Sequence, residues 1–247
     1  MERRVKMLTI TGKTIFPAAA LTILILAGCT INLDHDSDGE ARTDSKAIDL
    51  DKSELVRVIL KMGAGELNVR GGSPKLMEGE FNYNNPRLKP EVRYDGGGFR
   101  GHLEVQEPSN SFHGGRSKYR WDLRFNDEKP LDMEVHFGAG EGRLDLGSLS
   151  LRSLEVHMGV GQLRVDLRGT PKHDYDVNIH GGVGEATVYL PEGVGISADA
   201  SGGIGGINAR GLQKRGSRYV NDAYGHAKTN IHLQIRGGIG SINLLGG

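Results

Sequence analysis

The most reactive side chain in the sequence is Cys29, the only cysteine among 247 residues. It follows an apolar run, Ile15 to Ala27, which is preceded by Arg3, Arg4, Lys6 and Lys13. A basic start, a short apolar core and small residues before a cleavage point are typical of an export signal. The run is shorter than the roughly 20 residues of a membrane-spanning helix, and Pro17 interrupts it. We therefore predict that residues 1–28 are a signal peptide that is removed.

The residues at the predicted cleavage point, Leu26-Ala27-Gly28-Cys29, resemble the lipobox of bacterial lipoproteins. In that motif the peptidase cuts between the positions of Gly28 and Cys29, and the cysteine thiol carries a diacylglycerol. The alternative is an ordinary secretory signal with a chance cysteine. Lipid on Cys29 would hold the protein on the cell membrane or the outer membrane and would leave no thiol for a disulfide. By resemblance to Gram-negative sorting, Thr30 in place of an Asp favours the outer membrane.

Residues 29–49 are rich in Asp, Ser and Thr, and such a segment buries too little apolar surface to order itself. We predict a flexible acidic tether. The opening of an EF-hand calcium loop is matched within it by Asp34, Asp36, Asp38 and Gly39. Its twelfth position is Ser45 instead of the bidentate Glu that the loop needs, so a solvated linker is the favoured interpretation.

A second group that could do chemistry consists of Glu134, His136, Glu155, His157 and His180. Residues two apart in a strand share a face, so each Glu-x-His pair would present a carboxylate and an imidazole together. That combination could hold a divalent cation or titrate near pH 6. A flat row lacks the enclosing shell of most metal sites, so we predict a solvated outer face and no metal.

Nothing in the sequence indicates an enzyme. The carboxylates Asp145, Asp166 and Asp199 are scattered, and neither a Ser/His/Asp arrangement nor an H-E-x-x-H motif occurs. Gly97-Gly98 and Gly114-Gly115 lack the strand-loop-helix context of a phosphate loop. We predict no catalytic residues and no cofactor. With 31 basic and 31 acidic residues the chain also offers no argument for nucleic-acid binding.

The elements that must position these residues are repeats of a Gly-apolar-Gly unit. The six copies are Gly63-Ala64-Gly65, Gly138-Ala139-Gly140, Gly159-Val160-Gly161, Gly182-Val183-Gly184, Gly203-Ile204-Gly205 and Gly238-Ile239-Gly240. The second to fifth copies are spaced by 21, 23 and 21 residues. We expect both glycines of each copy to form a structural corner, since a residue without a side chain allows positive φ and close backbone approach.

Apolar and polar residues alternate on both sides of every corner, as in two short strands. The predicted inward positions are Leu60, Val135, Val156, Ile179, Ala200 and Ile235 before the corner, and Leu67, Gly142, Leu163, Ala186, Ile207 and Ile242 after it. A unit this small must stack on its neighbours to bury its apolar face. We predict an all-β, single-domain β-solenoid of stacked short strands with repeated Gly-apolar-Gly corners. An antiparallel sandwich of hairpins is the alternative.

Several stretches resemble the toast-rack family of bacterial envelope proteins, which includes LiaF-like and adhesin-like domains. They are Gly79–Tyr83, Leu88–Val92, Arg120–Asp127, Pro130–Val135 and Gly138–Gly140. The resemblance implies a stacked β-solenoid, with residues 50–130 as the family's N-terminal part and 131–247 as regular repeats. It implies no catalytic residues. The membrane helix of LiaF-like proteins is absent, and a lipid would replace it.

The expected function is a non-enzymatic, lipid-anchored scaffold or sensor accessory that docks another envelope component. A surface adhesin or polysaccharide-binding module is the alternative, and sugar-stacking aromatic platforms would favour it. The aromatic residues lie mainly in the N-terminal half, at Tyr83, Tyr94, Phe112, Tyr119 and Trp121, and we expect them to pack in the core.

The last repeat, Ile231 to Leu244, is followed only by a few residues. An open final coil would present unpaired backbone groups to another strand. We expect this coil to be a docking surface for a second copy or a partner, with the Leu212 to Thr229 insertion as an alternative lid.

Overall fold

The computed structural model describes residues 40–109 and 118–246. Their regular structure is β-strand, apart from one turn of 3-10 helix at Pro86–Leu88, and fourteen strands form a single mixed sheet. The predicted all-β class is confirmed. The strands are β1 Arg42–Ile48, β2 Leu55–Arg70, β3 Met77–Tyr83, β4 Glu91–Asp95, β5 Arg100–Gln106, β6 Tyr119–Phe125, β7 Leu131–Asp145, β8 Leu151–Asp166, β9 Tyr175–Leu190, β10 Gly195–Ile204, β11 Ile207–Arg210, β12 Gln213–Arg215, β13 Arg218–Val220 and β14 Asn230–Gly246.

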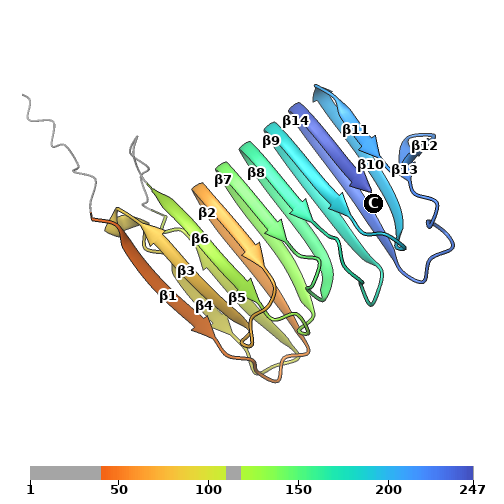
Figure 1. The fold of residues 1–247 in the computed structure, drawn as a ribbon. Helices are drawn as coiled ribbons and strands as arrows, with labels where there is room; N and C mark the ends of the chain where they lie inside the picture. Colours follow the sequence, from red (N-terminus) through yellow and green to blue (C-terminus); the bar gives the residue numbers. More distant parts are fainter. Residues whose placement is uncertain (1–39, 110–117, 247) are drawn as a thin grey trace, which may run out of the picture. The chain divides into compact units, whose positions relative to one another are not determined.

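The six repeats lie side by side as parallel neighbours in the order β2-β7-β8-β9-β14-β10 (Figure 1). Their corners are in register: Gly65 pairs with Gly140, Gly140 with Gly161 and Gly161 with Gly184. Hairpins would pair antiparallel, so the sandwich alternative does not describe these repeats. The glycines align because any shift by one residue would turn the alternating apolar side chains outward.

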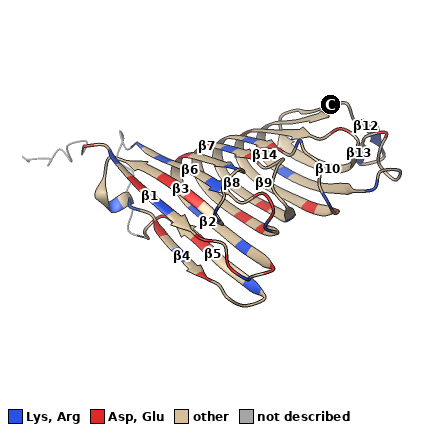
Figure 2. Cartoon of the chain, turned by 60° about the horizontal axis from the view of Figure 1, so that its bottom comes forward, with Lys and Arg blue, Asp and Glu red and all other residues tan. Residues whose placement is uncertain are grey.

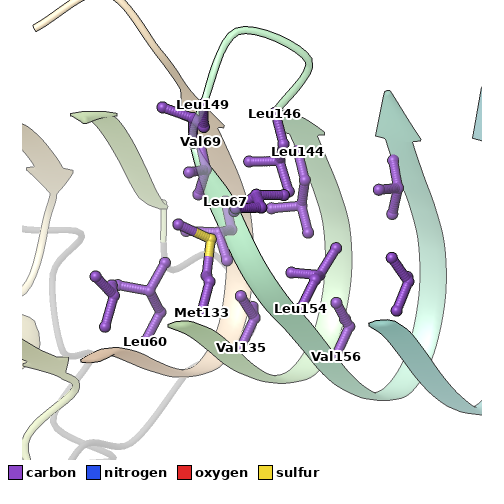
Figure 3. Close-up of a cluster of buried hydrophobic side chains, with 14 of the residues drawn as sticks. Leu60, Leu67, Val69, Met133, Val135, Leu144, Leu146, Leu149, Leu154 and Val156 are labelled. Carbon is purple, nitrogen blue, oxygen red and sulfur yellow. The ribbon is translucent and has the colours of Figure 1, made fainter. Parts of the chain in front are cut away.

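Each of the first five repeats in this order is one continuous strand of 15 to 17 residues, where the sequence predicted two short strands. The strand bends at its glycines, and the apolar side chains of its two halves point toward one another (Figure 3). Only the last repeat is interrupted, with β10 ending at Ile204 and β11 beginning at Ile207. The corner is therefore a bend within a ladder of backbone hydrogen bonds.

The predicted inward rows form the core. Leu60, Leu67, Val135 and their equivalents in β8, β9 and β14 are buried. Two predicted inward residues are only partly buried, Ala200 of β10 and Ile207 of β11, and so is Ala209 of β11. These strands pair with β14 on one side, and a second neighbour is missing over most of their described length, so half of the packing surface is absent.

On the other side of β2, two separate strands take the places of the two halves of a repeat. β5 pairs parallel with residues 55–61 of β2, and β6 pairs parallel with residues 66–70. β4 pairs antiparallel with β5, while β3 and then β1 extend the sheet antiparallel from β6. Sequence reasoning missed this further repeat because no Gly-apolar-Gly corner joins its halves.

The predicted tether over residues 29–49 is too long. Arg42–Ile48 forms β1 and pairs residue by residue with β3. Most of its side chains are exposed, so backbone pairing with a sheet edge orders it, where the prediction considered only apolar burial. Residues 29–39 lie outside the described part of the chain.

The prediction that the last repeat is the open end of the stack is wrong. β14 lies between β9 and β10 and pairs with both (Figure 1). The edge is formed by β10 and β11, and β13 from the 212–229 insertion covers part of it through Ser197 and Ala198. The short connection between β9 and β10 passes over the position next to β9, and the 212–229 insertion brings the chain back to fill that position with β14. The repeat spacing alone does not reveal this order.

Candidate functional site

The predicted cleavage and lipidation residues, Gly28 and Cys29, lie outside the described part of the chain. The same is true of the first residues of the calcium-loop pattern, which are Asp34, Asp36, Asp38 and Gly39. Ser45, the twelfth position of that pattern, is in β1 opposite Glu80 of β3. Ser45 is therefore part of a strand and not of a calcium loop.

The corner glycines form two ladders across the stack. The second glycine of every copy has a φ between 124° and 143°, and these residues are Gly65, Gly140, Gly161, Gly184, Gly205 and Gly240. A Cβ on Gly161 would lie 2.0 Å from the carbonyl oxygen of Gly140. The first glycines lack positive φ but approach their neighbours as closely. A Cβ on Gly159 would lie 2.4 Å from the Gly138 oxygen, and Gly182, Gly203 and Gly238 are similar, whereas Gly63 faces the Glu107 carboxylate.

Between the two glycine ladders runs an exposed line of apolar side chains, which we call the corner ridge. Its members, in spatial order, are Ala64, Ala139, Val160, Val183, Ile239 and Ile204. The four larger side chains are 45% to 71% exposed. Their size increases from β2 toward β10. Large apolar residues in contiguous exposed positions mark interaction surfaces more often than scattered ones do.

Polar rows of opposite character flank the corner ridge. The row before it consists of Lys61, His136, His157, His180 and Arg236 in register. The row after it consists of Glu66, Glu141, Gln162, Glu185 and Ser241. Elsewhere basic and acidic positions are interspersed along the strands (Figure 2). The ridge therefore has Lys, His and Arg side chains on one side and mainly Glu side chains on the other.

The predicted Glu/His row is assembled as the spacing requires. The rings of His136 and His157 stack with centroids 4.9 Å apart, and those of His157 and His180 with centroids 5.2 Å apart. His136 Nε2 lies 2.6 Å from Glu134 Oε1, and His157 Nε2 lies 2.8 Å from Glu155 Oε1. Each carboxylate thus contacts the imidazole of its own strand.

Glu134 has a second partner. Arg57 of β2 donates a hydrogen bond of 2.7 Å from its Nη2 to Glu134 Oε2. The hydrogen bond from Arg57 and then the contact with His136 lower the pKa of Glu134 below its ordinary value of 4.5. Sequence reasoning identified the carboxylate but not this cation, because Arg57 is far from it along the chain.

The stacked histidines line a surface groove of about 870 Å³, which also contains Lys61, Glu107 and the first corner glycines of four strands. The Glu107 carboxylate accepts a hydrogen bond of 2.7 Å from the backbone N–H of Gly63. Within residues 40–109 and 118–246 no group of three or more His, Cys, Asp or Glu side chains is placed to hold a metal ion. The groove thus combines these polar groups with the apolar side chains of Met62, Phe137 and Met158.

The aromatic residues pack mainly in the core, as expected. Tyr83, Tyr119 and Trp121 are buried, and the Trp121 ring makes edge contacts with Phe81 and Tyr119 at centroid distances of 5.7 Å. Phe112 lies outside the described residues. The exposed aromatic residue Phe99 lies in the connection between β4 and β5 and is 70% exposed.

No helix in the described part of the chain is long and apolar enough to cross a membrane. A comparison with curated proteins gave no match. Among solved structures, a "putative cell adhesion protein" from Clostridium sporogenes is 33% identical, and the match covers 84% of this chain and 100% of that one with a TM-score of 0.79.

Two further solved structures, both described as a "putative adhesin", have much lower sequence identity to this chain. One from Bacteroides fragilis is 8% identical over 83% of this chain and 97% of that one, with a TM-score of 0.22. One from Parabacteroides distasonis is 11% identical over 84% and 98%, with a TM-score of 0.26. Neither likeness informs on function.

Two family descriptions match the sequence itself. Residues 139–244 match the C-terminal domain of LiaF, described as a cell wall-active antibiotics response protein. Residues 37–189, more than half of the chain, match the N-terminal domain of toast_rack. The bent parallel strands and the sequence matches agree, and the chain belongs to the toast-rack family.

Proposed function

We propose that the protein is a lipid-anchored, non-enzymatic scaffold or sensor accessory of the cell envelope, which docks another envelope protein through its corner ridge. The bent strands would work as a β-solenoid that presents this ridge on a rigid support. The observation that carries the proposal is the ridge itself: four large apolar side chains in register, exposed to 45% or more, between a row that contains His and Arg and a row that contains Gln, Glu and Ser. Apolar contact would supply affinity, and the rows would orient the partner.

Site-specific photo-crosslinking in cells tests the docking surface. A photoreactive residue at Val183, on the ridge, should capture an envelope protein. The same residue at Asp176, which is exposed on the same strand, should not. Val183→Asp should abolish the capture from a neighbouring ridge position such as Val160. Identical products from Val183 and Asp176 would contradict the proposal.

The anchor needs a separate test. Cys29→Ser should abolish incorporation of labelled palmitate and processing by the lipoprotein peptidase, because the thiol is the acceptor in the lipobox motif. The folded region beyond Ile48 should keep its circular dichroism spectrum. Palmitate still incorporated into Cys29→Ser would refute anchoring through this residue. Separation of the inner and outer membranes would show which of them holds the wild-type protein.

The second candidate is an adhesin or polysaccharide-binding module, and the cell-adhesion description of the 33% identical relative favours it. Most described aromatic side chains are buried, which leaves few rings for sugar stacking. A glycan array discriminates the two functions: binding that Phe99→Ala removes and Val183→Asp leaves intact would favour the second candidate.

Self-association would use the edge formed by β10 and β11 instead of β14. Light scattering at increasing protein concentration tests this, with Ile204→Lys as the variant. A monomer at all concentrations would exclude self-association through this edge.

A further inference from the structure

The type of residue just before the corner differs between the two halves of the stack. In β2, β7 and β8 it is Met62, Phe137 or Met158, and these side chains are buried inside the bend. In β9, β14 and β10 the equivalent residues are Gly181, Gly237 and Gly202. The bend is therefore filled in three adjacent strands and lacks this side chain in the next three.

These three glycines differ from the corner glycines. None of them has a positive φ, so the backbone would accept a side chain. A Cβ on Gly181 would meet no atom within 4 Å, and one on Gly202 would meet only Ile242 Cδ1, at 3.9 Å. Neither the backbone conformation nor a close neighbouring atom explains why these two positions are glycine. The absence of a side chain at Gly181 and Gly202 leaves empty space inside the bend.

That space is a cavity of about 230 Å³ inside the last bends. Its apolar lining includes Met158, Ile179, Ala186, Tyr219, Ile235 and Ile242. It reaches the interruption between β10 and β11, where Gly205, Gly206 and Ile207 are part of the lining. The cavity is partly open to solvent, and its apolar side chains offer contact surface to an apolar guest.

The cavity has one charged lining residue, Arg236. Arg236 is exposed and forms no salt bridge with any residue that the structure describes. Its neighbours in register are His180 and Ser201. Because Arg236 belongs to the outer polar row, an anionic group at the outer rim of the cavity would meet a guanidinium that has no salt bridge among the described residues.

We propose that this cavity binds one linear alkyl chain whose anionic head group is held by Arg236. The three glycines lie in adjacent strands, so the positions that lack a side chain span two strand spacings, about 10 Å. The Ile242 side chain lies close to the middle one, Gly237. A flexible alkyl chain can follow the cavity past Ile242 more easily than a rigid ring. The inference goes beyond the docking function, although Val183 and Ile239 of the ridge also belong to the cavity lining.

Calorimetric titration with decanoate tests the site. The protein is the full chain carrying Cys29→Ser, so that no attached lipid competes for the cavity. We expect saturable binding with one decanoate per chain. Gly181→Met, which copies Met158 of the neighbouring strand, should weaken binding at least about tenfold by filling the slot. Gly202→Leu should have the same effect from β10, on the far side of β14, and serves if Gly181→Met does not fold.

Gly98→Met is the matched control, because Gly98 is also free of positive φ and open around its Cβ but lies in an exposed loop. It should keep the parent affinity within about twofold. Arg236→Gln should weaken decanoate binding and leave competition by decan-1-ol unchanged.

Absence of saturable decanoate binding would overturn the proposal, as would equal affinity in the Gly181, Gly202 and Gly98 variants. An equal loss of decanoate and decan-1-ol in Arg236→Gln would overturn the assignment of the head group.

Discussion

The filled bends of β2, β7 and β8 and the hollow bends of β9, β14 and β10 have corners in the same register, and the residue just before the corner separates the two groups. Met62, Phe137 and Met158 occupy the inside of the first three, while Gly181, Gly237 and Gly202 leave a cavity in the others. The same register and the same corners run through both halves. The corner glycines thus determine where the strand bends, and the residue before them determines whether the bend is solid.

This difference shows that glycine has two separate roles in the chain. At Gly161 the positive φ and the neighbouring carbonyl oxygen exclude any side chain. At Gly181 a side chain would meet only empty space. Amino-acid composition does not distinguish these two roles, but substitutions do, because a side chain should destabilise the protein at Gly161 and fit at Gly181.

Gly161→Val should lower the free energy of unfolding by at least about 4 kcal/mol. The positive φ disfavours a β-branched residue, and the new Cβ would lie 2.0 Å from the Gly140 oxygen. Urea unfolding measures the loss. Gln162→Ser, the exposed neighbour, should change stability by less than about 0.5 kcal/mol. Equal midpoints for the two variants would show that the corner does not require glycine.

Phe137→Ala should lower the free energy of unfolding by about 3 kcal/mol, because it empties a filled bend. Val160→Ala removes an exposed ridge side chain in the next strand and should cost less than about 0.5 kcal/mol. Thermal and urea unfolding of both variants provide the comparison. Similar losses in the two would mean that burial inside the bend contributes little.

Gly181→Met should raise the free energy of unfolding by about 1 kcal/mol, since its side chain would enter the empty cavity without backbone strain. The melting temperature should rise while the circular dichroism spectrum stays the same. Gly98→Met, on an open loop, should leave the melting temperature unchanged. A destabilised Gly181→Met variant would show that the hollow bend closes in solution.

Glu134→Gln should change the free energy of unfolding least of these variants, and the change should depend on pH. The pKa of Glu134 is lower in the folded protein than its ordinary 4.5, so its ionised form stabilises the fold above that pH. The stabilisation is lost as the pH falls from about 5 through the lowered folded pKa. The variant should therefore show a flatter acid limb in a plot of unfolding free energy against pH. The equivalent residue in β9, within the hollow half, is Asn178, which does not titrate. Parallel curves for wild type and variant would contradict the stabilising role of the Arg57–Glu134 pair.

Much of the repeat could be predicted from the sequence. Leu60 and Leu67 are buried as their alternation requires, and His136 and His157 stack as their spacing requires. The residues of the corner ridge are the middle residues of the Gly-apolar-Gly units, but sequence reasoning did not predict that they form an exposed surface. β1 was missed because its residues show no apolar alternation, and the β5–β6 repeat because it has no corner.

By itself, the sequence determined which side of each strand faces inward and where each strand bends, because alternation and glycine act on the local backbone. Only the tertiary structure decided which repeats are neighbours. The residues of β14 alone do not show whether this strand lies between β9 and β10 or at the end of the stack, since the repeats present similar surfaces to one another. The pairing of β13 with β10 and the length of the insertion decide it. The cavity depends on the same choice, because three glycines create one continuous space only where their strands lie side by side.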